Sequence, residues 1–403
     1  MNSLIKEVID SQSRKAFLDF PRQLYANTPE WVCPPDLEIE QIFNPKKNVF
    51  FRHGKATRWI LKGKENQILG RIAAFINEKK AFQGPIKTGG IGFFECADNQ
   101  DAADQLFDTA KTWLEKHGME AMDGPVNFGE NDRYWGLMVE GFEQPAFGMP
   151  FHLPYYQKLF EDYGFKVFFR QVSKELDLTE PLPERFQKIG EWVRQKEGVK
   201  FIHANHDNIP FFAEGFKTIY NDAWQFHENF TPVNDEQVKQ IVKDFKPLLI
   251  SCFMPMALVH DEPAAFIVCI PDLNQIFKPL QGKLNLMDKL QFLWRKRNEF
   301  VWYRKRGILT RGRVVIMGVR PRFQKYGLES GLIISSINEA RELGFQKIEL
   351  SWVGDFNPKM QRLLSATGAR QSAVHHTYRY VFDEDISFER SGQIPMERGE
   401  KAQ

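Results

Sequence analysis

The sequence predicts an α/β protein in which two halves repeat one order of strands and helices. Residues 313–370 read as strand, loop, helix, strand and helix, which is the order of a parallel β-α-β unit. Residues 89–164 follow the same order, although the two stretches share few residues. A chain of 403 residues also exceeds a single compact core. We therefore predict domains over 1–171 and 172–390 and a disordered polar tail over 391–403.

Hydrophobic periodicity defines the elements of the first half. Apolar residues alternate, or recur at steps of three and four, which are the spacings of strands and helices. The elements predicted here are, in order, a helix over 14–27, strands over 56–61, 67–77 and 89–95, a helix capped by Asp98 or Asn99 and ended by Gly118, a strand over 119–126 and a helix over 155–163. The long insertion between Asn127 and Tyr155 has a length typical of lids or binding walls.

The second half uses the same spacings and adds helices. The elements predicted here are, in order, a helix marked by Phe186, Ile189 and Val193, helices over 211–227 and 235–245, a hairpin of 256–259 with 264–270, a helix over 286–303, a strand over 314–319, a helix from Leu328 to Gly344, a strand over 347–353, a helix from Pro358 to Gly368 and a final strand that carries Tyr378. The basic runs at 295–297 and 304–306 are each interpreted as a solvated helix face.

The loop at 320–327 has the chemistry of an anion site. It joins the end of a strand to the start of a helix, where backbone N–H groups are unpaired and the helix dipole is positive. Arg320, Arg322 and Lys325 make the loop basic, and Gly327 lets the backbone approach a ligand. A phosphate or pyrophosphate would be held there. A basic turn without any ligand is an equally good interpretation of the spacing alone.

The segment that begins at Val319 resembles the acetyl-CoA signature of the GNAT acyltransferase superfamily. That signature ends a strand in V-x-P and continues as Q/R-x-x-G-x-G/A into a helix; here Val319-x-Pro321 is followed by Gln324-Lys325-Tyr326-Gly327-Leu328. The likeness extends over 310–382 and implies a GNAT-like fold of two tandem domains, each with a mixed central sheet flanked by helices. The sequence departs from the signature at Glu329, where a small residue is usual and a carboxylate would repel pyrophosphate.

The same resemblance implies an acyl-CoA co-substrate, either acetyl-CoA or another acyl-CoA, and no metal. Pyrophosphate would lie against the loop amides, pantetheine along the preceding strand, and Asn357 on the far side of the cofactor. The residues implied in binding are Met317, Gly318, Val319, Gln324, Lys325, Tyr326, Gly327, Leu328 and Asn357. The equivalent turn of the first half, 96–101, is acidic and would not hold pyrophosphate, so that half is structural or faces the substrate.

Acyl transfer to an amine needs a base for the amine, hydrogen-bond donors for the developing oxyanion and a proton for the leaving thiolate. Glu349 is the candidate base because it lies in an otherwise apolar strand; a solvent-facing position would explain it equally well. Resemblance implies that a strand amide is the oxyanion donor. A bulge at Gly318 would free one, and a packing glycine is the equal alternative. Tyr378 and His375 are the candidate acids, with a structural role as the commoner alternative.

Charge and cysteine usage bear on partners and compartment. The 54 basic side chains nearly balance 52 acidic ones, so the net charge of +2 indicates neither nucleic acid nor a membrane as a partner. The four cysteines are far apart, lack metal-ligand spacing and predict buried free thiols; they are Cys33, Cys96, Cys252 and Cys269. Neither a signal peptide nor a membrane span is recognisable. We predict a cytoplasmic protein and leave the oligomeric state open.

The expected activity is transfer of an acyl group, acetyl in the first instance, from acyl-CoA to the amine of a small molecule or peptide. Two alternatives stay open. One is a GNAT-like ligand-binding protein without turnover, which Glu329 would explain. The other is a transferase that takes its acyl group from an acyl carrier protein or an aminoacyl-tRNA, for which the two basic runs would be the docking patch.

Overall fold

The computed structural model describes residues 4–131, 133–225 and 232–393. Its strands are β1 (Leu4–Glu7), β2 (Gly54–Lys62), β3 (Ile68–Asn77), β4 (Thr88–Cys96), β5 (Ala121–Gly124), β6 (Leu137–Glu140), β7 (Lys166–Asp177), β8 (Val199–His203), β9 (Pro255–Val259), β10 (Glu262–Pro271), β11 (Arg311–Val319), β12 (Lys347–Gly354) and β13 (Arg370–Val381). They form one mixed sheet in the order β1-β2-β3-β4-β5-β13-β7-β12-β11-β10-β9-β8, with β6 paired to β13.

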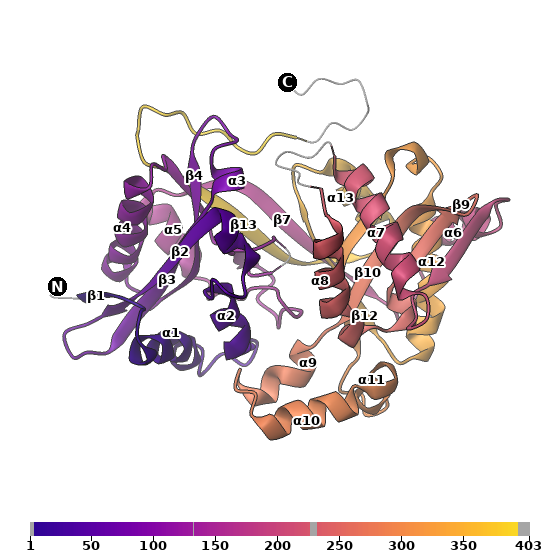
Figure 1. Cartoon of the computed structure of the whole chain (residues 1–403), viewed down its shortest axis with the longest axis horizontal. Coiled ribbons are helices and arrows are strands. Elements are labelled where there is room, and N and C mark those ends of the chain that lie inside the picture. The colour runs from indigo at the N-terminus through magenta and orange to yellow at the C-terminus, as the bar shows by residue number, and fades with distance from the viewer. Residues whose placement is uncertain (1–3, 132, 226–231, 394–403) are drawn as a thin grey trace.

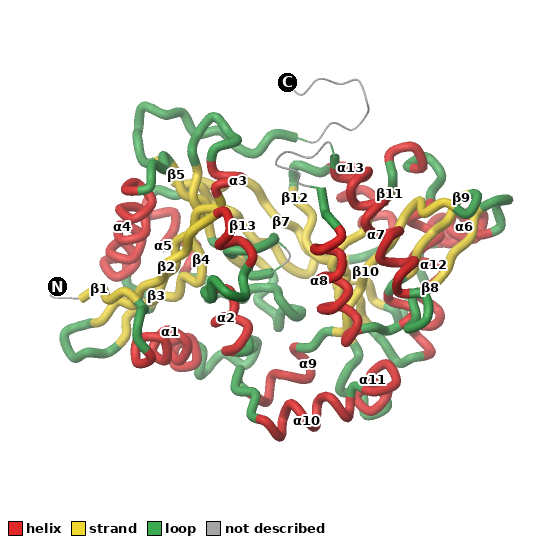
Figure 2. Tube along the Cα trace, in the orientation of Figure 1, coloured by secondary structure: helices red, strands yellow, loops and turns green. Residues whose placement is uncertain are grey.

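Helices lie around this sheet (Figure 2). They are α1 (Ser11–Leu24), α2 (Asp36–Ile42), α3 (Glu78–Ala81), α4 (Gln100–Lys116), α5 (Tyr156–Tyr163), α6 (Glu184–Arg194), α7 (Ile209–Trp224), α8 (Asp235–Phe245), α9 (Asn274–Phe277), α10 (Leu286–Arg295), α11 (Arg297–Arg304), α12 (Leu328–Glu342) and α13 (Pro358–Ala366). The alternation of strands with helices confirms the predicted α/β class.

The predicted elements of the first half are present. β2 and β3 form the predicted antiparallel hairpin, and β4 pairs in parallel with β5. α4 begins after Asn99, whose side chain accepts a hydrogen bond from the Ala102 N–H, and it buries Leu106, Phe107 and Leu114. This helix is held by its cap and by an apolar face that packs on the sheet.

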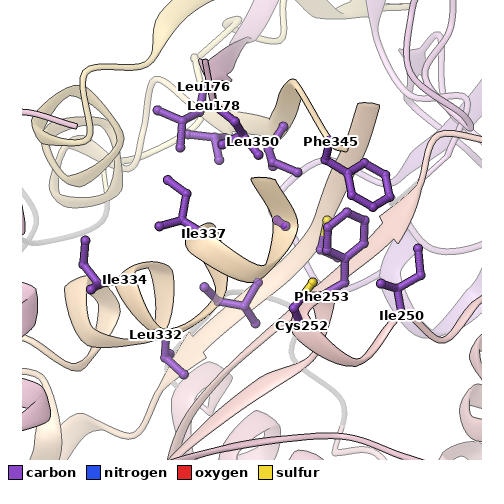
Figure 3. Packing of buried hydrophobic residues seen from close by; sticks show 14 of the residues in the cluster. Leu176, Leu178, Ile250, Cys252, Phe253, Leu332, Ile334, Ile337, Phe345 and Leu350 are labelled. Atoms are coloured by element: carbon purple, nitrogen blue, oxygen red, sulfur yellow. The ribbon is translucent and has the colours of Figure 1, made fainter. Parts of the chain in front are cut away.

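In the second half, β11, α12 and β12 form the predicted parallel unit, with β11 and β12 adjacent. α12 buries Leu332, Ile334 and Ile337 in a core that also contains Phe253 and Phe345 (Figure 3). Burial of each such side chain contributes roughly 1.5–3 kcal/mol. Packing therefore fixes α12 against the sheet, and the short loop before it cannot move far from the end of β11.

The two halves exchange their last strands. β7 begins within the first half in sequence, yet it pairs with β12, and its Leu176 lies in the core of the second half. β13 ends the chain, yet it pairs with β5 and adds Tyr378 to the core of the first half. β7 and β13 also pair with each other and join the halves into one sheet (Figure 1). The predicted domain boundary at 171/172 lies inside β7, and the division stays a prediction.

The predicted single helix over 286–303 is wrong. α10 ends at Arg295, and residues 298–300 adopt left-handed φ values of 50°, 54° and 61° before the chain becomes helical again. The carboxylate of Glu299, inside this break, accepts a hydrogen bond from the Ser251 N–H at 2.9 Å. Apolar and basic residues continue through the break, so the pattern gives no sign of a turn that a distant backbone group stabilises.

Several short elements were missed, among them α2 and the strand β6 inside the insertion. The four cysteines are buried free thiols, as predicted. None of the helices in the described part of the chain has both the length and the hydrophobicity needed to cross a bilayer. Among the same residues, no His, Cys, Asp and Glu side chains are grouped to hold a metal ion. The predicted tail, and the end of the helix predicted over 211–227, reach beyond the described residues.

Candidate active site

The first feature of the candidate site is the point where β11 and β12 part. The two strands pair only at 311–313, opposite 347–349. Beyond these residues, β11 stays paired with β10, and β12 stays paired with β7. A bulge at Val315 and a left-handed φ of 55° at Ser351 accompany the separation. One edge of β11 therefore has no strand partner in the described chain, and its backbone groups can face a ligand.

The second feature is the N-terminus of α12. Gly327 occupies the cap position with a φ of 72°, which glycine adopts without strain, and it offers no capping side chain. Within the described residues, the amides of Lys325, Gly327 and Leu328 have no hydrogen-bond partner. A helix N-terminus with unpaired N–H groups attracts anions. The backbone thus provides donors at the place where the sequence predicts an anion site.

The charged side chains of this corner are arranged differently from the expectation. Arg320 forms ion pairs with Asp222 of α7 and Glu262 of β10, both at 2.6 Å. Arg322 also pairs with Glu262. These guanidinium groups neutralise carboxylates of the protein itself, because α7 and β10 bring acidic side chains to the loop. Lys325 is exposed and keeps its charge facing solvent.

Glu329, the departure from the signature, has a cation nearby. Lys359 of α13 reaches the loop, where its Nζ donates to Gln324 Oε1 at 2.8 Å. Burial raises the pKa of Glu329, and the positive charge of Lys359 acts in the opposite direction. The raised pKa and the neighbouring ammonium both reduce the repulsion that this carboxylate would exert on an anion. Unpaired amides with Lys325 and Lys359 therefore fit a pyrophosphate group.

Gly318 is a packing glycine rather than the site of the bulge. It pairs regularly with Phe266 of β10, and the register shift lies at Val315 instead. A Cβ at Gly318 would come within 2.6 Å of the Trp224 ring. Any larger residue would therefore collide with α7. The neighbouring Met317 is also regularly paired with β10 and packs against the core of the second half.

Other residues predicted to bind the cofactor support the backbone of the corner. Val319 and Leu328 are buried in the core. Tyr326 is half-buried, with the Lys196 Nζ 4.4 Å from its ring centroid. The Asn357 side chain accepts a hydrogen bond from the first turn of α13 at 3.2 Å and so caps that helix. These side chains hold the loop and α13 in place, and the unpaired groups that remain for a ligand are backbone amides.

Glu349 is a buried carboxylate beside the parting point. Its register partner on β11 is Arg313, and it is 6% exposed. The Ser372 hydroxyl donates to it, 3.2 Å from each oxygen. Burial raises the pKa of Glu349 to about 7, although the charge of Arg311 lowers it. A carboxylate that titrates near neutrality is suited to act as a general base.

The two candidate acids form hydrogen bonds with partners other than Glu349. His375 is buried, and its Nε2 donates to the Pro150 carbonyl at 3.2 Å; burial lowers its pKa to about 4, so the ring is neutral at pH 7. Tyr378 lies in the core of the first half, where its hydroxyl donates to Glu161 at 2.9 Å. Along β13 it is on the order of 20 Å from Ser372, the partner of Glu349. The N–H of the neutral His375 ring is therefore engaged by Pro150, and Tyr378 is distant from Glu349 along the strand.

The insertion predicted to be a lid or wall packs on the second half. The Phe147 N–H donates to Asp272 at 2.8 Å, and Arg313 donates to the Phe147 carbonyl at 2.7 Å. Arg311 forms an ion pair with Asp272 at 2.7 Å and donates to two further carbonyls of the insertion. The insertion is therefore fixed as a wall over the start of β11, next to Glu349.

Sequence reasoning missed Arg311, Arg313 and Asp272. A signal for them was present, because charged residues lie within three positions of the ends of the apolar strand runs at 264–270 and 314–319. Charges at the ends of apolar strands usually mark the protein surface. Here the charged side chains are buried because the insertion of the first half covers them, and a local sequence pattern cannot predict that contact.

The first half contains a cavity of about 70 Å³ at the end of β4. The ion pair of Arg71 with Glu95 lies in its lining, and Glu95 accepts hydrogen bonds from the hydroxyls of Tyr25 and Tyr156, both at 2.7 Å. Burial raises the pKa of Glu95. The insertion lines the opposite side. Apolar and aromatic walls are supplied by Trp31, Val32, Phe93, Phe94, Met149 and Phe151.

Comparisons with known proteins bear on this geometry. No protein-family model matches the chain. It is similar to Protein YghO of Escherichia coli, at 27% identity over 383 residues, which cover 93% of this chain and 94% of that protein. It is also similar to a protein of Caulobacter vibrioides named bacterial ceramide synthase, at 27% identity over 373 residues, which cover 90% of this chain and 94% of that protein.

Solved structures share the architecture. A tandem GNAT protein of the clavulanic acid biosynthesis pathway aligns with a TM-score of 0.55 and 10% identity over 95% of this chain and 99% of that one. A GCN5-related N-acetyltransferase from Sphaerobacter thermophilus aligns with a TM-score of 0.52 and 9% identity, over 96% and 98%. The open helix N-terminus beside two parting strands therefore lies in a known architecture: this chain has the GNAT fold, as two tandem GNAT-like domains.

Proposed function

We propose that this protein is an N-acyltransferase whose second half moves an acyl group from acyl-CoA to an amine. The observation that carries the proposal is the open N-terminus of α12, which follows the unpaired edge of β11 and lies in the same β-α-β unit as Glu349. Backbone amides would hold the diphosphate, with Lys325 and Lys359 adding positive charge. The exchanged strands argue that the proposed domains, 1–171 and 172–390, fold together.

Different residues of this chain would serve the separate steps of acyl transfer. When bound, acyl-CoA supplies the acyl group as an activated thioester. An unpaired amide of β11 beyond residue 313 would donate to the developing oxyanion. Glu349 would take the proton that the amine must lose as the new C–N bond forms. The leaving thiolate takes its proton from solvent in this scheme, because the N–H of His375 is engaged by the Pro150 carbonyl and the Tyr378 hydroxyl donates to Glu161.

The acceptor that we propose is the amine of a long-chain amino alcohol. The support is the name of the Caulobacter relative, a ceramide synthase, because a ceramide is the amide of a fatty acid with such an amine. The same name supports a fatty acyl donor over acetyl. The insertion would be the wall shared by both substrates, since it touches Arg313 on one side and lines the first-half cavity on the other.

Calorimetric titration with acetyl-CoA tests the donor site. Gly327→Asp places a carboxylate among the unpaired amides and should weaken binding by at least about a hundredfold, because like charges in contact cost several kcal/mol. Gly344→Asp is the matched control. Gly344 has a comparable left-handed φ of 90° beyond the other end of α12, with no atom near its Cβ position. Equal binding by the wild type and Gly327→Asp would remove the donor proposal.

Release of free CoA from palmitoyl-CoA over a panel of amines tests turnover. We expect release with long-chain amino alcohols and little with short amines. Binding of acetyl-CoA without release on any amine would instead support the alternative of a GNAT-like ligand-binding protein. Release from acyl carrier protein or aminoacyl-tRNA, but not from acyl-CoA, would support the other alternative.

A further inference from the structure

The helix α10 is well formed, but its apolar face is exposed and points away from the core. Its start is fixed by a capping box, in which Asn285 accepts from the Asp288 N–H and Asp288 accepts from the Asn285 N–H. Its contact with the body is made mainly through α11 and through Phe292, whose ring lies 5.0 Å from that of Phe277. In Figure 1 the helix lies along the lower edge of the molecule. Nothing in the described chain covers its outer side.

That outer side is apolar. Five large side chains are between 53% and 74% exposed, and at 100° per residue they fall within an arc of about 120°. They are Leu286, Met287, Leu290, Leu293 and Trp294. A soluble helix normally turns such a stripe toward a core. Here the stripe faces away from the core, and it includes a tryptophan.

Basic residues surround the stripe. Residues 278–306 contain nine Lys or Arg and two acidic side chains, a formal charge of +7 in a chain whose total is +2. Both carboxylates are engaged, since Asp288 caps α10 and Glu299 accepts from a backbone amide. Several of the cations are exposed and form no ion pair within the described chain; they are Lys283, Lys289, Arg297 and Lys305.

We infer that α10 and its basic flanks dock this protein on the surface of a lipid bilayer that contains anionic headgroups. A formed helix with Leu, Met and Trp on one face and Lys and Arg beside it is the composition of helices that lie in the bilayer interface. Tryptophan favours that depth, and each nearby cation gains from the negative surface potential. Charge complementarity selects anionic lipid, and the inference departs here from the prediction of no membrane partner.

Docking through α10 is independent of acyl transfer, because it uses a different helix from the one that follows the loop at 320–327. The α10 face is anchored at its start, because the Gly282 carbonyl accepts from the Asp36 N–H at 3.0 Å and the Gln281 carbonyl accepts from Arg22 at 2.9 Å. A docked α10 would therefore orient the whole molecule on the membrane and would not act as a loose tether.

Vesicle co-sedimentation of the full chain tests the inference. We expect binding to phosphatidylcholine vesicles that contain phosphatidylglycerol, and partitioning at least about tenfold weaker on phosphatidylcholine alone or in high salt. The double variant Leu290→Glu/Trp294→Glu should lose at least about tenfold as well. Trp192→Glu on α6 is the matched control, because Trp192 is 60% exposed against 59% for Trp294. It should bind as the wild type does.

Failure of the wild type to bind anionic vesicles, or equal losses in the control and the double variant, would overturn the inference. Two other occupants give distinct results. A second copy of the chain would show as a dimer in sedimentation velocity that the double variant converts to monomer. An acidic partner such as acyl carrier protein or RNA would bind the wild type without lipid and lose binding in the double variant. Either result, together with no vesicle binding, rejects the membrane.

Discussion

The two halves of this protein share one arrangement and differ in whether it is left open. In the first half, β4 and β5 pair at 88–90 opposite 121–123; in the second, β11 and β12 pair at 311–313 opposite 347–349. A helix follows the first strand in each case. In α4 the first-turn amide of Ala102 is taken by the Asn99 side chain, whereas α12 begins at Gly327, which has none. The same fold thus yields a helix start capped by its own side chain in one half and a helix start without a side-chain cap in the other.

The carboxylates at matching registers differ in the same way. Asp123 of β5 and Glu349 of β12 each hold the third position of the parallel pairing. Arg379 binds Asp123 with two hydrogen bonds, at 2.7 and 2.8 Å. Burial raises the pKa of both carboxylates, but Glu349 has a serine hydroxyl at 3.2 Å in place of a guanidinium, and its pKa is about 7. The halves therefore share a fold but differ at two positions: the residue that caps the helix and the partner of the buried carboxylate.

The largest expected effect is on the rate of CoA release, and it distinguishes Glu349 from Asp123, the carboxylate at the equivalent position of the first half. Glu349→Gln should lower kcat/KM for CoA release by about 10²–10⁴-fold, which is the usual contribution of a general base. Asp123→Asn should leave the rate within a few-fold but lower the free energy of unfolding by about 1–3 kcal/mol, because Arg379 loses its partner. Steady-state kinetics measures kcat/KM, and thermal unfolding measures the change in stability. Equal losses of rate in both variants would erase the contrast between the halves.

The raised pKa of Glu349 should appear in both activity and stability. The rate should rise with pH through about 7 as the base ionises. Stability should change in the opposite direction. The folded state favours the protonated form, so the stabilisation is complete below the ordinary pKa of 4.5 and is lost as pH rises through about 7.

A shift of this size corresponds to roughly 3 kcal/mol. Denaturant unfolding of the wild type between pH 4.5 and pH 8 should therefore show a decrease that Glu349→Gln lacks. Parallel pH profiles for the two proteins would show that Glu349 titrates normally.

A smaller effect is expected from the cations of the open corner. Lys325→Ala should weaken acetyl-CoA binding by at least about tenfold, because a charge-assisted contact to a diphosphate contributes roughly 1.5–3 kcal/mol. Lys116→Ala, at the end of α4 in the first half, is the matched control and should bind normally. Calorimetry at low and high salt separates the two, since the Lys325 contribution should shrink with screening. An equal loss in the control would point to a general charge effect.

The smallest effect concerns Glu329. Glu329→Gln should tighten acetyl-CoA binding by about threefold, because it removes a negative charge from the first turn of α12. The same change should leave stability equal or slightly higher, because burial disfavours the charged form of Glu329 more than the helix start favours it. Asp101→Asn, in the first turn of α4, should affect stability alone. Weaker binding by Glu329→Gln would mean that this carboxylate assists the ligand.

Local patterns were sufficient for most elements and for the loop in which Gly327 precedes α12. α8 was predicted with its observed bounds, and the loop with Gly327 was predicted as an anion site, because caps, periodicity and glycine act within a few residues. The helix over 286–303 was predicted as one element because its break depends on Ser251, which is distant in sequence. The pairing of Arg320 with Asp222 was missed for the same reason.

The sequence by itself determined the α/β class, the repeated β-α-β units and the position of the glycine corner, since each depends on short-range periodicity or on backbone freedom at one residue. Tertiary structure alone decided that β7 and β13 change places, that the insertion covers Arg313, and that Glu349 is buried beside a serine. Those features depend on which distant segments meet. The pKa of Glu349 is near 7 because the segments that pack around it remove water from the carboxylate.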